Sequence, residues 1–308
     1  MQTDWRDYIK LGVNHHLLYC DAVSDPVAHL ATLERVLSDE RLDAVDLWIP
    51  SDSRIASRAI ACCTESPCDI HYNVGTRAGR PSAEPASPDP ATRAYSLSFY
   101  KEELALAVAA GAVKIVTNSG PDQPDNRAGA TSALVDFYCE ICSLVPESTV
   151  ILIEPTDRDV SKRKLIGPSS EAVEVVRRVR AEGHANMASM VDMGHLPLMH
   201  ETVSQAFAAT GPYCGHVHLG NCILRNPDHP LFGDKHVPWG IDDGEYGMEE
   251  LVELLRCAFA CGYLGAGRRG TLTFEMRPYP GTSPEASLDR FFAWFTQAWS
   301  RIGFDAGG

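Results

Sequence analysis

The sequence predicts an α/β protein whose eight strand and helix units close into one barrel. Apolar, strand-like runs alternate with amphipathic helical stretches along all 308 residues, a pattern typical of parallel strands joined by crossover helices. No GxGxxG motif follows the first run, and no Pro- or Gly-rich linker divides the chain. A single (β/α)8 TIM barrel over residues 1–308 is therefore favoured over a doubly wound open sheet or two domains.

The eight expected strands are apolar runs, most of which end near a polar side chain. They are residues 11–19, 44–50, 69–75, 113–120, 149–155, 187–195, 214–221 and 270–278. The expected helices are residues 25–39, 51–64, 96–111, 131–145, 169–183, 200–211, 248–262 and 285–303, of which 51–64 has the weakest pattern. Four of the helices end at a glycine, as helix C-termini often do, namely Gly111, Gly183, Gly211 and Gly262.

Two connections are unusually long, residues 76–92 and residues 221–247. Both follow strands. In a barrel they therefore lie on the face where active sites are built.

Composition narrows the class of protein. The chain has 27 basic and 41 acidic residues, a formal net charge of −14, so binding to nucleic acid or to an anionic membrane surface is not expected. No apolar run approaches the roughly 18 residues of a membrane span, and the first ten residues lack the features of a secretory signal, so we expect a cytoplasmic protein. Its ten cysteines, including the Cys139 and Cys142 pair within a helical pattern, are then expected to be reduced packing residues.

Four side chains that can bind a metal lie at the ends of the last four expected strands. They are Glu154, Asp192, His218 and Glu275. Because strand ends converge on one mouth of a barrel, three carboxylates would lie close together and repel one another unless a cation neutralised them. Oxygen-rich ligation with one imidazole suits Mn²⁺, Mg²⁺ or Co²⁺.

The motifs ILIEP, VDMGH, GHVHLGN, HVPWGIDDGEYG and TFEMRP, in this order and spacing, resemble the xylose-isomerase-like TIM barrel superfamily of sugar phosphate isomerases and epimerases. The resemblance covers nearly the whole chain and is strongest over residues 149–278. Similarity to the ketose 3-epimerase branch implies that Glu154, Asp192, His218 and Glu275 bind one divalent metal ion, Mn²⁺ first among the candidates. It also implies that His195 binds the substrate.

The sequence departs from that branch at two positions. Ketose 3-epimerases carry a second Glu and an Arg where this chain has Val160 and Leu224, although Arg225 lies one place further on and is a candidate substitute. The segment 156–168 therefore points to a loop built for another substrate. The same superfamily includes endonuclease IV, but Asn118 stands where that enzyme has a zinc-binding His, and the charge of −14 opposes DNA binding.

Further substrate contacts are expected around the mouth. The candidates are His71, Asn118, His195, Arg225, His236 and Arg277. His15 and His16 are expected on opposite faces of the first strand, so only one of them looks into the barrel.

The leading functional hypothesis is abstraction of a proton next to the carbonyl of a sugar or sugar derivative. Glu154 and Glu275 would move the proton, giving epimerisation or aldose–ketose isomerisation through an enediolate. The alternative is β-elimination from a 3-oxo-glycoside, a C- or O-deglycosidase lyase reaction, in which His195, His71 or His236 serves the leaving group. A non-catalytic binding protein is a third reading. The resemblance also implies a homo-oligomer, or a hetero-oligomer with a small β-rich subunit.

Overall fold

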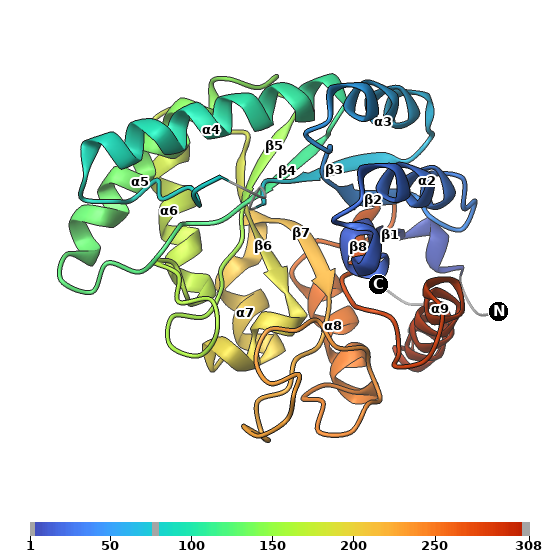
Figure 1. Cartoon of the computed structure of the whole chain (residues 1–308). Helices are drawn as coiled ribbons and strands as arrows, with labels where there is room; N and C mark the ends of the chain where they lie inside the picture. The colour runs from blue at the N-terminus through green and yellow to red at the C-terminus, as the bar shows by residue number, and fades with distance from the viewer. Residues whose placement is uncertain (1–3, 76–79, 304–308) are drawn as a thin grey trace.

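The computed structural model describes residues 4–75 and 80–303, and its eight strands are all parallel. They form a closed barrel in chain order, as predicted (Figure 1). The strands are β1 (Ile9–Asn14), β2 (Ala44–Leu47), β3 (Asp69–Asn73), β4 (Lys114–Thr117), β5 (Val150–Ile153), β6 (Met187–Asp192), β7 (Cys214–Leu219) and β8 (Gly270–Phe274). Pairing of β1 with β8, from Ile9 opposite Gly270 to Val13 opposite Phe274, closes the ring.

Helices surround the barrel (Figure 1). They are α1 (His15–Leu18), α2 (Pro26–Leu37), α3 (Ser53–Glu65), α4 (Pro90–Ala109), α5 (Arg127–Cys142), α6 (Ser169–Ala181), α7 (Val203–Thr210), α8 (Met248–Ala260) and α9 (Pro284–Arg301). Side-chain caps fix several starts, since Asp25, Asp52 and Asp89 each accept backbone N–H bonds of the first turn. The four predicted C-terminal glycines all have positive φ. The helix with the weakest sequence pattern, 51–64, is present as α3.

The first strand is shorter than predicted. β1 ends at Asn14, whose side chain accepts a hydrogen bond from the backbone N–H of Leu17 and so starts the short helix α1. The prediction that His15 and His16 lie on opposite faces of a strand is therefore wrong, because both belong to α1. Similarly, β6 ends at Asp192, and His195 lies in a single 3-10 turn after it.

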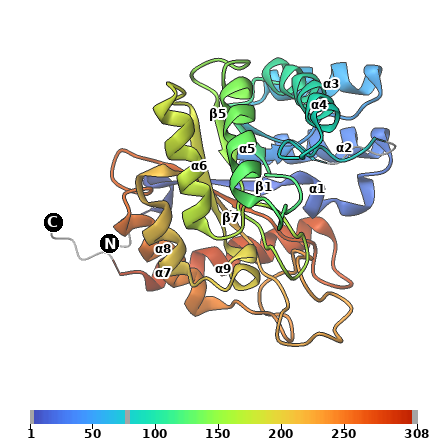
Figure 2. The same cartoon turned by 90° about the vertical axis from the view of Figure 1, so that its left-hand side faces the viewer.

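The structure describes all of the expected loop 221–247 but only part of the expected loop 76–92. Residues 76–79 of the expected loop 76–92 lie outside the described residues, and α4 begins at Pro90, two residues before the expected end of that loop. The loop from 220 to 247 contains no helix and is held by an isolated bridge between Ile223 and Gly233. Figure 2 shows this loop on the same side of the barrel as α1, which follows the carboxyl end of β1.

The barrel interior has an apolar side and a polar side. Val116, Leu152, Ala188 and Met190 form a separate small apolar cluster from β4, β5 and β6. The other strands supply buried polar groups, among them Asp46, His71, His216 and Thr273. β1 approaches its neighbours so closely that a Cβ on Gly12 would lie 2.8 Å from Thr273 Oγ1, which explains the glycine there.

No helix among residues 4–75 and 80–303 is long and apolar enough to cross a membrane. All ten cysteines are free thiols, and Cys142 is buried while Cys139 is partly exposed. Burial raises the pKa of both thiols, as expected for packing residues.

Candidate metal centre

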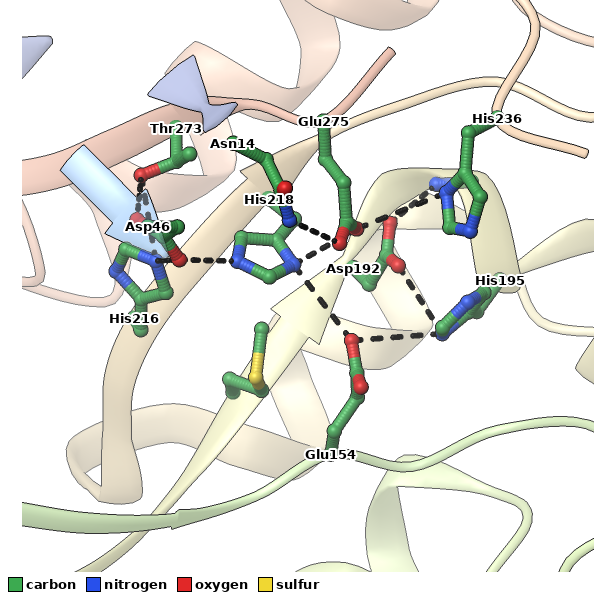
Figure 3. A network of polar contacts seen from close by, with 12 residues as sticks. Asn14, Asp46, Glu154, Asp192, His195, His216, His218, His236, Thr273 and Glu275 are labelled. Carbon is green, nitrogen blue, oxygen red and sulfur yellow. Dashed lines mark hydrogen bonds and ion pairs between the residues drawn. The ribbon is translucent and has the colours of Figure 1, made fainter. Parts of the chain in front are cut away.

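Four side chains from four strand ends meet at the mouth of the barrel. Glu154 and Glu275 directly follow β5 and β8, while Asp192 ends β6 and His218 lies in β7. One ligand atom from each lies within 4.8 Å of the others. Figure 3 shows Glu154 and Glu275 reaching this group from opposite directions. We call these four residues the carboxylate–histidine cluster.

The contacts within the carboxylate–histidine cluster are close but leave atoms without hydrogen bonds. His218 Nδ1 lies 2.8 Å from Glu275 Oε2 and 3.6 Å from Glu154 Oε1. His218 Nδ1, Glu275 Oε2 and Asp192 Oδ2 are all buried and lack a well-aligned hydrogen bond among the described residues. Buried polar atoms are rarely left in this state unless an ion or water completes the site. This donor set, three carboxylates and one imidazole, fits a divalent cation.

Without a bound cation, protonation of a carboxyl group reduces the repulsion among these carboxylates. Burial, together with the nearby charges of Glu275 and Glu154, raises the pKa of Asp192 to about 8 against the opposing effect of His195. Burial alone would lower the pKa of His218, but the adjacent Glu275 carboxylate holds it well above its usual value. Protons and a cation therefore compete for the same buried negative charge.

Asp46 contacts His218, the histidine of the carboxylate–histidine cluster. Its Oδ2 lies 2.9 Å from His218 Nε2 and 3.2 Å from His216 Nε2, while its Oδ1 lies 2.9 Å from His71 Nδ1 and accepts from Thr273 Oγ1 at 2.9 Å (Figure 3). Although burial opposes ionisation, the histidines hold the pKa of Asp46 well below its usual range. As an ionised acceptor, Asp46 fixes the proton of His218 on Nε2 and leaves Nδ1 free to bind a cation.

Asn14 orients one of the two glutamates. Its Nδ2 donates to Glu275 Oε1 at 3.0 Å, and both side chains are buried. The other oxygen, Oε2, is the one that faces His218 Nδ1. Asn14 therefore leaves a single defined oxygen of Glu275 for the centre of the cluster.

A cavity of about 270 Å³ opens onto this site, and we call it the mouth cavity. Among its lining residues are Glu154 and Glu275 of the carboxylate–histidine cluster together with His195 and His236. The rest of its lining consists of His16, Leu17, Asn73, Val74, Gly75, Val116, Thr117, Asn118, Thr156, Lys162 and Lys164. A partly enclosed cavity of this size suits one small molecule.

A second group lies beside the first and consists of His195, Asp234 and His236. Asp234 Oδ2 lies 3.2 Å from His195 Nε2, and Asp234 Oδ1 lies 3.3 Å from His236 Nε2. Unlike the carboxylate–histidine cluster, this group already has a cation, because Lys162 Nζ lies 3.0 Å from Asp234 Oδ2. His195 also connects the two groups through its Nδ1, 3.1 Å from Asp192 Oδ2. Burial opposes charge on His195, but Asp192 and Asp234 hold its pKa well above the usual value.

The expected substrate contacts divide into two sets. His195, His236 and Asn118 line the mouth cavity. His71 does not line it; the side chain is fully buried beneath the cluster on Asp46, its direct partner in the β2–β3 register. Arg225 and Arg277 are exposed, and Arg225 is bound to Glu245 instead. The placement of His71, Arg225 and Arg277 does not fit direct contact with a molecule in this cavity.

Sequence reasoning missed several groups that the structure brings to the site. Asp46 is a lone acid within the apolar run AVDLWIP, and an inward-facing acid in a barrel strand is a usable signal. Lys162 and Lys164 come from the loop after β5, where their position after a strand was also visible. Asn14 carried no such signal, because its role depends on the proximity of β1 to β8.

The chain belongs to the xylose isomerase-like TIM barrel family, because residues 68–292 match the sequence model of that family. The carboxyl-end cluster in a closed eight-stranded barrel agrees with this assignment.

Three known proteins illustrate the similarity. The chain is 26% identical over 174 residues to D-psicose 3-epimerase of Ruminiclostridium cellulolyticum, a match that covers 54% of this chain and only 56% of that protein. The structure resembles a D-tagatose 3-epimerase-like protein, with a TM-score of 0.70 and 13% identity over 96% of this chain and 100% of that one. It also resembles 3-keto-D-glucoside 4-epimerase from E. coli, with a TM-score of 0.65 and 14% identity over 94% of this chain and 99% of that one.

Proposed function

We propose that this protein is a divalent-metal-dependent epimerase or isomerase that acts on a keto sugar or sugar derivative. The carboxylate–histidine cluster supports this most directly, because four ligand atoms converge within 4.8 Å and three of them lack a well-aligned hydrogen bond among the described residues. Similarity to D-psicose 3-epimerase adds support for a sugar substrate. A bound divalent cation would supply Lewis acidity, polarising a substrate carbonyl and stabilising an enediolate.

The chain's own residues would move the proton. Glu154 and Glu275 line the mouth cavity and reach the carboxylate–histidine cluster from opposite directions, so one can take a carbon-bound proton and the other can return it (Figure 3). Return to the opposite face of the same carbon gives an epimer, and return to the neighbouring carbon gives an aldose–ketose isomer. Asn14 holds Glu275 in place for this role.

β-Elimination from a 3-oxo-glycoside is the second candidate, because imidazoles that can serve a leaving group line the same cavity. His195 and His236 both lie beside the cluster, and either can give a proton to a departing aglycone. The first step, abstraction of a proton next to a carbonyl, is the same as in epimerisation. The two candidates therefore differ only in the fate of the enolate.

One experiment tests both. The purified protein, loaded with Mn²⁺, Mg²⁺ or Co²⁺ in turn, is incubated in D₂O with free ketoses and with 3-oxo-glycosides, and the products are followed by NMR. We expect deuterium at the carbon next to the carbonyl, together with sugar interconversion. Aglycone release without interconversion would favour elimination, and the absence of exchange with every keto sugar would refute proton abstraction.

A further inference from the structure

Two lysines of one loop stand in the wall of the mouth cavity, and only one of them has a counter-ion. Lys162 Nζ lies 3.0 Å from Asp234 Oδ2, so its charge is matched. Lys164 also lines the cavity, yet its ammonium group has no hydrogen bond or ion pair with any residue that the structure describes. Both side chains belong to the connection between β5 and α6.

The loop that carries these lysines is held rigidly. Asp157 is fully buried, and its carboxylate accepts backbone N–H bonds from Val160, Ser161 and Lys162 at 2.9, 2.6 and 2.9 Å. The backbone of Lys164 is fixed as well, because its N–H donates to the carbonyl of Asp157 at 2.9 Å. The position of Lys164 is therefore built into the fold and is not that of a free surface lysine.

Among the described residues that line the mouth cavity, Lys164 is a cation without an ion pair. Asp234 is matched by Lys162, and the carboxylates of the cluster face one another around a shared centre. Glu154 and Glu84 are near enough to favour the charged form of Lys164, but neither makes an ion pair with it. Burial nevertheless lowers the pKa of Lys164, and the charge of Lys162 adds to this effect. A partly buried ammonium without a partner is costly, and an incoming anion would remove that cost.

Lys164 also lies between the mouth cavity and a second cavity, because it lines both. The second, smaller cavity of about 40 Å³ adjoins the mouth cavity, and Lys164, Asn118, Val74 and Gly75 line both. No residue of the carboxylate–histidine cluster lines the smaller cavity. A group bound at Lys164 would therefore be a part of the substrate other than the reacting carbons.

We propose that the substrate is an acidic sugar derivative whose carboxylate or phosphate binds Lys164. The inference deepens the proposed function, on which it rests for the position of the reacting carbonyl, but binding of the anion does not depend on turnover. Lys164 would then act as a specificity-determining residue. A neutral ketose would leave its ammonium unpaired.

The test compares binding of three unreactive probes that share a six-carbon polyol, measured by isothermal titration calorimetry on the metal-loaded protein. D-Gluconate carries a carboxylate, D-glucitol 6-phosphate carries a phosphate, and D-glucitol is neutral. We expect at least one anionic probe to bind about 10- to 100-fold more tightly than D-glucitol, as for a hydrogen bond to a charged group. Lys164→Met should abolish this preference and Lys164→Arg should retain most of it. The anion that loses affinity in Lys164→Met identifies the group.

The control is Lys101→Met, a lysine of α4 paired with Glu140 outside the cavity, which should bind all probes like the parent. Equal binding of D-glucitol and both anions, or an anion preference that survives Lys164→Met, would overturn the inference. Solvent deuterium exchange keeps the two proposals distinct. Its absence in the parent protein with neutral and acidic keto sugars alike would refute the proposed function alone, whereas its loss on a neutral ketose only in Lys164→Met would overturn the specificity role.

Discussion

Glu154 and Glu275 are equivalent in type but differ in their surroundings. Glu275 is fixed by Asn14, whereas Glu154 is the more exposed of the two, with 17% of its side chain accessible against 8%. Replacing either by Gln keeps its shape but removes the base. We expect kcat to fall by about 10²- to 10⁴-fold in each variant, the usual contribution of general acid–base catalysis. Steady-state kinetics on whichever keto sugar is turned over measures this.

Glu147→Gln is a matched control, because Glu147 is exposed in the turn that precedes β5, at the opposite end of the barrel from the cluster. It should leave kcat unchanged. Unfolding temperatures of all three variants separate a loss of chemistry from a loss of fold. If Glu154→Gln or Glu275→Gln retained full activity, the assignment of that residue to proton transfer would be wrong.

Asp46 is expected to control metal affinity without touching the metal. Each of its two oxygens receives two donors, so an Asn at this position can accept from only one pair. Asp46→Asn should weaken binding of Mn²⁺ by about 10- to 100-fold, the usual effect of losing the partner of a ligating histidine. Competition with a chromogenic chelator measures the affinity directly. Asp136→Asn, on the exposed face of α5, should not change it, and unaltered affinity in Asp46→Asn would refute the positioning role.

At the level of elements, the sequence predicted the order and type of the strands and helices but not all of their ends. The β1 boundary was missed because a single side-chain cap at Asn14 turns the chain into α1 before the apolar run finishes. Glu154 and Glu275 were predicted inside strands but lie one residue beyond them. These errors did not affect the prediction that the site lies at the carboxyl ends of the strands, because barrel topology determines which strand ends converge.

The loop between β5 and α6 offers a prediction at this same scale. Its conformation depends on Asp157, whose carboxylate accepts four backbone N–H bonds within the loop. Asp157→Ala should remove this support and increase hydrogen exchange of residues 160–163, because those amides lose their buried acceptor. Protection in β5 and α6 should stay unchanged. Hydrogen exchange with mass spectrometry resolves the two regions, and unchanged exchange in the loop would show that other contacts hold it.

At the scale of the whole molecule, the sequence could predict the site residues at strand ends but not the contacts that form only when the barrel closes. The four residues of the carboxylate–histidine cluster could be predicted, since each ends or follows its own strand. The supporting residues could not, because Asp46 reaches His218 only across the barrel interior and Asn14 reaches Glu275 only where β1 closes on β8. Arg225 shows the opposite error, because it was expected to replace an Arg of the ketose 3-epimerases, whereas Glu245 holds it at the surface.

We expect a bound cation to stabilise the whole fold in a way that depends on pH. Burial raises the pKa of Asp192 from its usual 3.8 to about 8, so without metal this carboxyl contributes stability below about pH 4 that is lost as the pH rises through 8. A cation binds only the ionised form. Binding below pH 8 must therefore release this proton, and affinity should rise with pH up to about 8.

The stabilisation by Mn²⁺ should accordingly grow from pH 6 to pH 8, by about 1.4 kcal/mol per pH unit for each proton released at a fixed, near-saturating concentration of free metal. Differential scanning calorimetry with and without Mn²⁺, at matched buffer ionisation enthalpy, measures the shift in Tm. Asp136→Asn should behave like the parent protein, because that carboxylate is exposed and outside the cluster. A metal-dependent shift in Tm that is equal at pH 6 and pH 8 would contradict the competition between proton and cation in the cluster.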